Sequence, residues 1–588
     1  MRKVYFILWF FFIELKLIKK RTKSILFFFK TFSISKLIQI NIFKKKIYPF
    51  KDENLNKYLI ENYFIWRKIK KNKKKIIIVD LTQNSHPLQV IIQCIISCNL
   101  KDFTSHECKA IINKYDWLSK FIAKSFLINK FIIVNRSNVF ERFFYYLKSL
   151  NLIKEKNFQK KLLKFKYKKI ELGRAAYEFT VRSYIKEIPT NRDNKFFYLA
   201  LAKALQAYDE SKKFFSDKNI SSFVMSEIQF VPNRIYFQNA LLKRIPIYSF
   251  YGARKNNSIS ICCFNNTKNI NRHRMKFSTK LLRYLNKNHK INLKKKINKF
   301  IKLETTGYQI GFGEKIFLKI LPKKKLLKFK NKKFFDKKFG LNNKLKNIMI
   351  LPNVFIDNLL THDKGLYSTP IEWFTETLKI ISKIKNVNWI IKPHPSEKIY
   401  DTNITAKNLF NNTIGKRKNV IILDKDYNIN NIEKYISKVI SFGGSAGYEY
   451  TRLGVPVITA ADTRYSNFKF TISPKNLVQY KKLLQSLNTK IVIDFNKKFR
   501  AGLYWYLIKR LAQLQNDLIP TYDTRKPGGL AAFWRLTYLI TKKNKKNKTV
   551  KQFSKNFHNQ LRNRNLHSLD MQELSKSKKL TNIKINDL

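Results

Sequence analysis

The chain has 588 residues, of which 44% are hydrophobic and 14% aromatic, and this composition excludes an intrinsically disordered protein. The 119 Lys and Arg residues outnumber the 38 Asp and Glu residues, and the formal net charge of +81 is typical of proteins that bind nucleic acid or an anionic membrane. Because Lys, Asn, Ile and Phe dominate while lysines are dispersed along the whole chain, we attribute most of the charge to A/T-rich codons. We therefore expect no nucleic-acid partner, and a basic nucleic-acid-binding protein is the non-enzyme alternative.

Residues 1–70 are predicted to form a basic N-terminal extension. The apolar run Val4–Ile13 is followed by the basic run Lys19–Arg21. Ten apolar residues are too few to span a bilayer, for which about 20 are needed. The pattern fits equally well an amphipathic helix lying on an anionic inner leaflet and a helix docked on the fold. We predict a cytoplasmic protein that is peripheral on the inner face of the inner membrane.

Residues 71–320 are predicted to form a first α/β domain, because candidate strands alternate with helical segments, as in parallel sheets covered by helices. The five cysteines imply no disulfide framework and fit a reducing compartment. Cys94 and Cys98 lie four residues apart in an apolar run, so we interpret them as buried helix residues rather than zinc ligands. The candidate strands are Lys75–Leu81, Phe131–Val134, Phe223–Ser226 and Pro246–Phe250.

The segment 321–345 is lysine-rich with little periodicity, which predicts a linker. Residues 346–498 then alternate clearly between strands and helices and are predicted to form a second, Rossmann-like domain. The residues 541–588 are predicted to be a polar, loosely held tail. The candidate strands of the second domain are Ile348–Leu351, Trp389–Ile391, Val420–Leu423, Val439–Ser441 and Pro456–Thr459, and Thr369 with Pro370 predicts the start of a helix.

A cluster of glycines follows one of these strands. Gly443, Gly444, Gly447 and Gly454 are four of only 15 glycines in the chain. A strand, a glycine turn and a helix start predict backbone N–H groups and a positive helix end aimed at an anion. Ser445 is expected to cap the helix, and Glu449 lies one helical turn further, where a carboxylate suits ribose hydroxyls. A tight turn without a ligand is the alternative.

A second motif, Lys392-Pro393-His394-Pro395, follows directly on the strand that ends at Ile391. In open α/β sheets, ligands bind beyond the carboxyl ends of the strands, so this tetrapeptide and the glycine turn should line one crevice. A lysine and an imidazole there could neutralise a leaving pyrophosphate. The alternative is a structural histidine in a rigid turn.

These motifs resemble bacterial capsule polysaccharide biosynthesis proteins, which are similar to β-Kdo transferases and polysialyltransferases and, more distantly, to CDP-glycerol glycerophosphotransferases. The resemblance covers about Asn347–Ser473. It implies an α/β, GT-B-like fold with two Rossmann-like domains facing across a cleft, and helices over 499–540 that return to the first domain. The motifs that carry the resemblance are Asn388–Pro395, Gly443–Tyr450 and Leu453–Ile458, together with Leu351–Asp357 and the helix start at Glu372–Trp373.

The resemblance also implies roles for single residues. The donor phosphate should contact Lys392 and His394, Glu449 should hold the ribose, and the loop from Asp357 to Asp363 should flank the donor. The residues expected around the phosphate are Ser441, Gly443, Gly444, Ser445 and Gly447.

An inverting enzyme of this type also needs a base for the acceptor hydroxyl. Our first candidate is His86, with Glu178 and Glu227 as alternatives. No metal-binding DxD motif lies at a strand end, so we expect no metal and no obligatory cofactor.

Together these features predict a glycosyltransferase of capsule or surface polysaccharide biosynthesis. It would transfer a sugar from a nucleotide-sugar donor, for which CMP-linked sugars are one choice, to a glycan or glycolipid acceptor. The expected partners are these substrates, the anionic inner-membrane surface and other polysaccharide assembly proteins. A CDP-glycerol-type polyol-phosphate transferase and a GT-B-fold sugar-nucleotide epimerase are the enzymatic alternatives.

Overall fold

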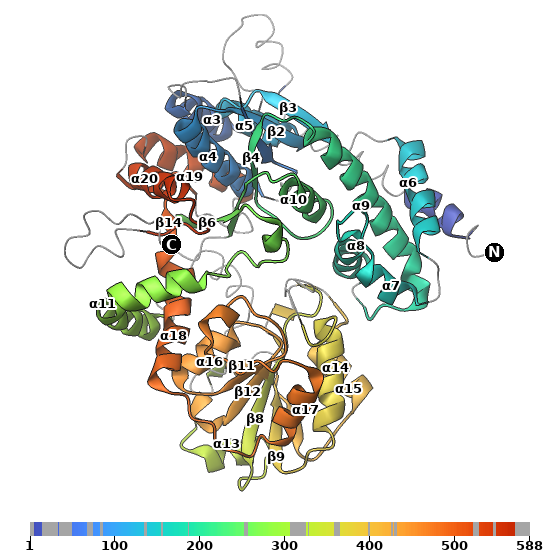
Figure 1. The fold of residues 1–588 in the computed structure, drawn as a ribbon, viewed down its shortest axis with the longest axis vertical. Helices are drawn as coiled ribbons and strands as arrows, with labels where there is room; N and C mark the ends of the chain where they lie inside the picture. Colours follow the sequence, from blue (N-terminus) through green and yellow to red (C-terminus); the bar gives the residue numbers. More distant parts are fainter. Residues whose placement is uncertain are drawn as a thin grey trace, which may run out of the picture. The chain divides into compact units, whose positions relative to one another are not determined.

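A computed structural model describes most of the chain, and its elements are drawn in Figure 1. The chain divides into two compact units, each built around its own sheet. The first unit comprises Met1–Thr180, Thr190–Ile270 and Ala512–Asp570, and the second comprises Val181–Pro189, Asn271–Leu511 and Met571–Leu588. The described residues are 5–14, 33, 50–66, 75–82, 86–134, 138–153, 157–185, 187–251, 257–305, 325–326, 329–357, 365–394, 396–397, 400, 402–424, 427–428, 432–520, 529–544 and 548–570.

The first unit is built on a seven-stranded sheet with the order β14-β6-β5-β4-β1-β2-β3. The strands β1 to β5 run parallel, whereas β6 is antiparallel to β5 and β14 is antiparallel to β6. The central strand β1 is buried at every position, which explains its continuous apolar sequence. The strands are β1 (Ile76–Asp80), β2 (Glu107–Asn113), β3 (Lys130–Val134), β4 (Ile220–Met225), β5 (Ile247–Tyr251), β6 (Ser258–Phe264) and β14 (Leu514–Gln515). All four strands predicted for this domain are confirmed.

Helices from distant parts of the sequence cover this sheet. The long helix α9 packs against α6 and α8, and α4 lies between α5 and α20. The helices are α3 (Glu53–Trp66), α4 (Pro87–Thr104), α5 (Trp117–Ser125), α6 (Val139–Leu152), α7 (Phe158–Lys164), α8 (Leu172–Thr180), α9 (Asn194–Phe214), α10 (Asn233–Leu242), α19 (Gly529–Asn544) and α20 (Lys548–Arg562), together with a helix over residues 5–14.

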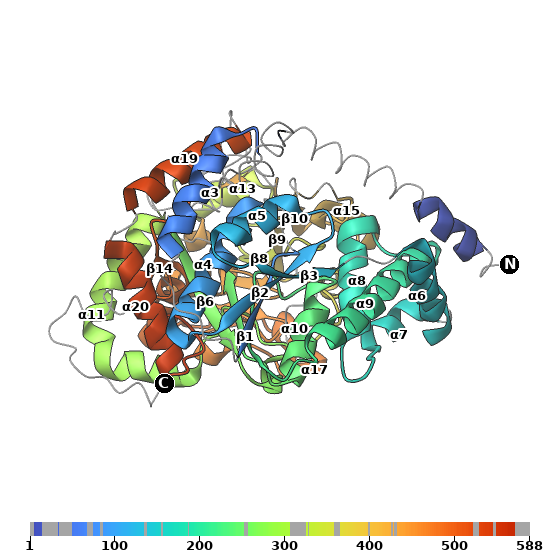
Figure 2. The ribbon, with the colours of Figure 1, turned by 90° about the horizontal axis from the view of Figure 1, so that it is seen from above.

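The two ends of this unit differ from the sequence-based expectation. Helix α3, in the predicted extension, lies beside α19, and the Tyr58 and Trp534 rings stack with their centroids 5.8 Å apart (Figure 2). The prediction of a loosely held tail over 541–588 is wrong for α20, because Phe553 and Phe557 are fully buried in the core of the first unit. The helix can bury these two apolar side chains in the core because the lysines around them can remain in solvent.

The second unit contains a five-stranded parallel sheet with the order β10-β9-β8-β12-β13. All five predicted strands are confirmed. The predicted helix start is also confirmed, because the Thr369 hydroxyl accepts a hydrogen bond from the Glu372 N–H at 3.1 Å. The strands are β8 (Lys346–Leu351), β9 (Val387–Ile391), β10 (Val420–Ile422), β12 (Lys438–Ser441) and β13 (Val457–Thr459), and a separate ribbon pairs β7 (Lys325–Leu326) with β11 (Tyr427–Asn428). The helices are α11 (Thr279–Thr305), α13 (Lys332–Lys338), α14 (Pro370–Ile381), α15 (Ala406–Thr413), α16 (Ala446–Leu453), α17 (Leu477–Gln485) and α18 (Phe495–Tyr506).

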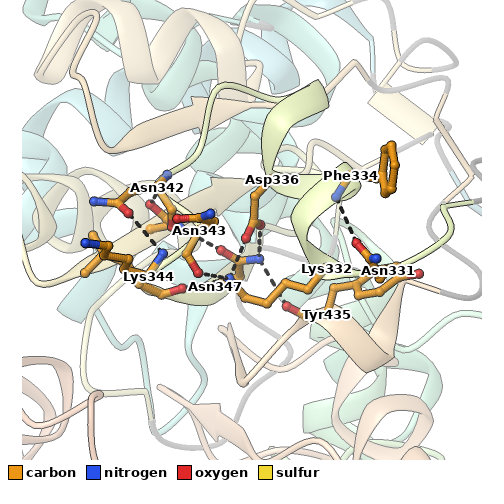
Figure 3. Close-up of polar contacts among 11 residues, drawn as sticks. Asn331, Lys332, Phe334, Asp336, Asn342, Asn343, Lys344, Asn347 and Tyr435 are labelled. Atoms are coloured by element: carbon orange, nitrogen blue, oxygen red, sulfur yellow. Dashed lines mark hydrogen bonds and ion pairs between the residues drawn. The ribbon is translucent and has the colours of Figure 1, made fainter.

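The predicted linker 321–345 is wrong over its described C-terminal part. Phe335 of α13 is fully buried in the core beside β8 and β12, and Asp336 accepts a hydrogen bond from the Asn347 amide at 2.7 Å. Figure 3 shows this network, in which Lys332 also pairs with Asp336. The Lys332 ammonium also donates to the Leu345 carbonyl at 3.0 Å. Buried polar groups with full sets of partners hold α13 at the amino ends of β8 and β9, the edge opposite the predicted crevice.

Two further boundaries lie elsewhere than predicted. Helix α11, assigned to the first domain by its sequence position, belongs to the second unit, and the chain returns to the first unit at Ala512 rather than at Phe499. Helix α18 stays with the second unit because it packs on α16 and α11. Its Tyr504 is fully buried among the rings of Tyr448, Phe468 and Tyr465.

Candidate nucleotide-binding site

The carboxyl edge of the second sheet has a topological switch point. The chain proceeds from β8 through β9 to β10 on one side, and β12 then pairs with β8 on the other side. Ligands of open α/β sheets bind at such points. The glycine turn follows β12, and the Lys392–His394 segment follows β9, so β8 lies between them. The two motifs therefore follow strands that are separated by one strand rather than adjacent.

The glycine turn is built for close approach rather than for an unusual backbone conformation. Gly443 and Gly444 are not among the residues with positive φ. The Gly444 N–H donates to the Ser441 hydroxyl at 3.3 Å, and a Cβ on Gly444 would lie 3.3 Å from the Asn353 side-chain oxygen. Asn353 follows β8 and was not among the predicted site residues, although it lies within the motif that predicted the neighbouring loop.

The first turn of α16 presents its backbone to the same edge. Ser445 occupies the N-cap position, but its side chain makes no capping hydrogen bond, contrary to expectation. Its carbonyl accepts from the N–H groups of Tyr448 and Glu449, which begin the helix. The Gly447 N–H donates to the Gly444 carbonyl at 3.4 Å, so the N–H groups of Ser445 and Ala446 are the ones that the start of a helix leaves without an intrahelical partner. These groups suit an anion.

Gly447 faces the interior of the unit and not the predicted phosphate position. A Cβ at Gly447 would lie 2.0 Å from the Tyr465 hydroxyl oxygen. That hydroxyl donates to the Gly444 carbonyl at 2.9 Å, and Tyr465 is fully buried. Because Gly447 has no side chain, there is room for Tyr465, whose hydrogen bond to the Gly444 carbonyl stabilises the turn.

Glu449 is half-buried at the end of the first turn of α16. Burial alone would lower the pKa of Arg464, but the hydroxyls of Tyr448 and neighbouring tyrosines and the Glu449 carboxylate raise it overall. Glu449 therefore lies within the electrostatic reach of a cation, which the sequence alone did not indicate.

The β9 segment places its two polar residues differently. Lys392 is buried, and its ammonium donates to the Pro393 carbonyl at 3.1 Å. His394 is half-buried, and its Nδ1 accepts from the Ser396 N–H at 3.1 Å. A neutral ring held in this way carries its proton on Nε2, which makes that nitrogen a donor. Pro395 lies outside the described residues.

The same local contact occurs at two other histidines. Nδ1 of His86 accepts from the Leu88 N–H at 3.1 Å, and Nδ1 of His273 accepts from the Met275 N–H at 3.0 Å. The motif is therefore a common way for this chain to satisfy a backbone donor at a turn. His394 and His86 each follow the carboxyl end of a strand near a switch point, β9 in the second sheet and β1 in the first, whereas His273 does not.

Asp357, predicted to flank the donor, has two partners from other segments. Its carboxylate pairs with Arg182 of the π-helical turn η1 (Val181–Ile185) and accepts from the Tyr400 hydroxyl at 3.0 Å. Burial, followed by the Asp357 charge, raises the pKa of Tyr400. Asp357 thus links the segment after β8 to η1 through its ion pair with Arg182. Asp363, the other residue predicted for this loop, lies outside the described residues.

The candidate bases belong to the first unit, whose sheet has its own switch point between β1 and β4. His86 caps α4 after β1, and its ring packs edge-on against Phe533. Glu227 follows β4, and one of its oxygens accepts from the N–H groups of Ile228 and Gln229. Glu178 is buried on α8. The topology therefore brings His86 and Glu227 to the same sheet edge.

One residue at that edge was missed. Asp80 ends β1, is fully buried and accepts hydrogen bonds from the Thr82 hydroxyl at 2.6 Å and from the Asn233 amide. Burial raises its pKa, although these hydrogen bonds lower it. It fastens the start of α10 to β1, and an apolar run that ends in a single Asp is the signal that could have revealed it.

Among the residues that the structure describes, no group of three or more His, Cys, Asp or Glu residues could hold a metal ion. Among the same residues, no helix is long and apolar enough to cross a membrane.

No protein-family model matches the chain, and no curated protein sequence matches it significantly. Among solved structures, it is similar to KpsC, a beta Kdo 2,4 transferase of Thermosulfurimonas dismutans, with 11% identity over 48% of this chain and 80% of that one and a TM-score of 0.32. It is also similar to the UDP-GlcNAc 2-epimerase of Neisseria meningitidis, with 12% identity, 75% and 100% coverage and a TM-score of 0.20. The spinosyn rhamnosyltransferase SpnG matches with 9% identity, 80% and 96% coverage and a TM-score of 0.19. At these identities the likeness concerns the fold alone. The chain itself has the predicted α/β class, with two Rossmann-like domains.

Proposed function

We propose that the protein is a glycosyltransferase that binds a nucleotide-sugar donor at the carboxyl edge of the second unit's sheet. The observation that carries this proposal is the glycine turn between β12 and α16, which lies at the β8–β12 switch point and is braced by Ser441 and Tyr465. A rigid turn with outward N–H groups recognises a diphosphate without reorganising. The fold class and the resemblance in the motifs support the same choice.

In this proposal each site residue has one task. The N–H groups of Ser445 and Ala446 at the start of α16 bind the donor phosphates, and His394 donates from Nε2 to the phosphate that leaves with the nucleotide. The buried Lys392 supplies positive charge from behind that segment. Glu449 accepts from ribose hydroxyls. No metal or other cofactor is needed in this scheme, because the helix end, His394 and Lys392 would neutralise the charge that develops on the leaving group.

Of the candidate bases, we favour Glu227 over His86. A base needs a lone pair for the acceptor proton, whereas the Nδ1 lone pair of His86 already accepts the Leu88 N–H. A neutral His86 ring whose Nδ1 accepts a hydrogen bond carries its proton on Nε2, so Nε2 is a donor and not a base. Glu227 is a carboxylate, which has no donor hydrogen when ionised and can accept a proton, and one of its oxygens accepts from the N–H groups of Ile228 and Gln229. The acceptor would be a glycan or glycolipid of a surface polysaccharide such as a capsule.

The test is a thermal-shift titration with CMP-, CDP-, UDP- and GDP-linked substrates, since a ligand that binds only the native state raises the melting temperature. We expect one nucleotide class to stabilise the protein and His394→Ala to keep its affinity while losing turnover. His273→Ala is the matched control, because it removes the same kind of backbone contact elsewhere. Stabilisation by oligonucleotides alone would overturn the proposal. Conversion of a UDP-sugar without any acceptor would favour the epimerase alternative.

A further inference from the structure

The helix over residues 5–14 is fastened to the first unit by one face. Phe6, Phe10 and Glu14 lie one turn apart and are buried. The Phe10 ring stacks on Tyr146 of α6 with a centroid distance of 5.0 Å. The Glu14 carboxylate pairs with Arg142 of α6 at 2.5 Å, and both side chains are nearly inaccessible. A buried pair of this kind holds the helix in one orientation.

The outward face of the same helix is also apolar. Tyr5 is 53% exposed, Leu8 66% and Phe12 54%, although all three are large hydrophobic residues. The neighbouring helix α6 continues this surface with Phe140 and Phe144, which are 80% and 62% exposed. Both views show the two helices side by side (Figures 1 and 2).

Phe11 joins the two halves of this surface, because its ring lies 5.0 Å from that of Phe143 on α6. We call the six exposed residues the aromatic face: Tyr5, Leu8, Phe11, Phe12, Phe140 and Phe144. Apolar patches of this kind on a soluble surface mark a binding site, since water is a poor neighbour for them.

One lysine contacts the helix, and the sequence on either side of the helix is basic. Lys195 of α9 donates to the Tyr5 hydroxyl at 3.1 Å and lies 5.6 Å from the centre of the Trp9 ring. In the sequence, residues 2–30 contain eight Lys or Arg residues and one acidic residue, Glu14, which Arg142 neutralises. A protein partner with an apolar patch would not require this charge, whereas an anionic surface would.

We propose that the aromatic face is a membrane-binding surface that inserts into the headgroup layer of an anionic lipid bilayer. Aromatic rings are favoured at that depth because they combine an apolar body with tolerance for water. Lys195, together with the lysines and arginines that flank the helix in the sequence, would bind the acidic headgroups. The sequence left two alternatives, a helix docked on the fold and an amphipathic helix on a membrane. In this proposal both hold, because one face of the helix packs on the first unit and the other contacts lipid. The surface is independent of the proposed glycosyltransferase activity.

The test is co-flotation of the full chain with phosphatidylglycerol–phosphatidylcholine vesicles, compared with pure phosphatidylcholine vesicles. Two variants each remove one half of the face, Phe140→Ser/Phe144→Ser and Leu8→Ser/Phe12→Ser. The matched control is Ile291→Ser/Val478→Ser, which removes two exposed apolar side chains from the second unit. We expect each face variant to lower the vesicle partition coefficient at least about tenfold, because burial of one such side chain accounts for a factor of that size. The control should bind like the unmodified chain, and high salt should weaken all binding.

Melting curves and light scattering make the outcome unambiguous. The substituted side chains are exposed, so the melting temperature should not change. Equal vesicle binding by both face variants and the unmodified chain would overturn the proposal. A second result would also overturn it. The unmodified chain would fail to bind vesicles but would form a dimer, and Phe140→Ser/Phe144→Ser would dissociate that dimer. The aromatic face would then join two copies of the chain.

Discussion

Substitution of Gly447 by alanine tests how the glycine turn is supported. The new Cβ would lie 2.0 Å from the hydroxyl oxygen and 2.2 Å from Cζ of Tyr465, so one of the two must move. Tyr465 cannot retreat freely, because its buried ring packs against Phe470 and Tyr504. Overpacking of this kind costs about 1–3 kcal/mol, and loss of the hydrogen bond to Gly444 adds about 1 kcal/mol. We therefore expect Gly447→Ala to lower the free energy of unfolding by about 2–4 kcal/mol.

The same substitution should also weaken nucleotide binding, because the displaced Tyr465 no longer holds the Gly444 carbonyl. Urea unfolding measures the first effect and a nucleotide titration the second. Tyr465→Phe removes only the hydrogen bond and should cost about 1 kcal/mol. Gly340→Ala is the control. Gly340 has a φ of +63°, and no atom lies within 4 Å of the position of an added Cβ. This variant should lose some stability because of its backbone conformation but should keep the nucleotide affinity of the unmodified chain. If Gly447→Ala has the same free energy of unfolding and the same nucleotide affinity as the unmodified chain, Tyr465 does not support the turn.

Three further predictions concern single side chains of the second unit. His394→Ala should lower turnover about 10²–10³-fold while the melting curve is unchanged, and unaltered turnover would make His394 a structural turn residue. Asp357→Asn should weaken the attachment of η1, so that limited proteolysis cuts near Arg182 faster than in the unmodified chain; equal rates would show that the Tyr400 and Arg182 contacts contribute nothing. Burial, assisted by Lys346, lowers the pKa of Lys438 to about 8, so its contribution to stability is complete above its ordinary pKa and is lost as the pH falls through about 8. Urea unfolding between pH 7 and pH 10 should therefore show the unmodified chain gaining stability with pH relative to Lys438→Met, and parallel profiles would contradict this.

The strands of both sheets could be predicted because parallel strands are buried on both faces and therefore appear as short, continuous apolar runs. β1 and β9 are examples, since every residue in each is buried. The segment of α13 could not be recognised in this way. Its Lys332 and Asp336 look like solvent-exposed charges, and only the contacts with Asn347 and the Leu345 carbonyl reveal a buried network.

Domain boundaries were harder to predict because they depend on contacts between distant segments. Helices α11 and α18 have polar faces and no turn signal that assigns them to one sheet. Their packing on each other and on α16 places both in the second unit. The burial of Phe553 and Phe557 in the first unit is likewise invisible in a lysine-rich stretch until the partner surface is known.

At the candidate site, the sequence located the right segments but assigned some residues for the wrong physical reason. The rarity of glycine in the chain made the turn visible, yet Gly447 is small because Tyr465 needs its space, and Ser445 does not cap the helix. His86, His273 and His394 all satisfy a backbone N–H in the same way, so residue type and local geometry cannot separate them. Topology separates His273 from the other two, because His86 follows β1 at the switch point of the first sheet and His394 follows β9 beside the β8–β12 switch point, whereas His273 follows neither. In a chain this rich in lysine, strand order is therefore a better guide to a functional residue than the residue's own chemistry.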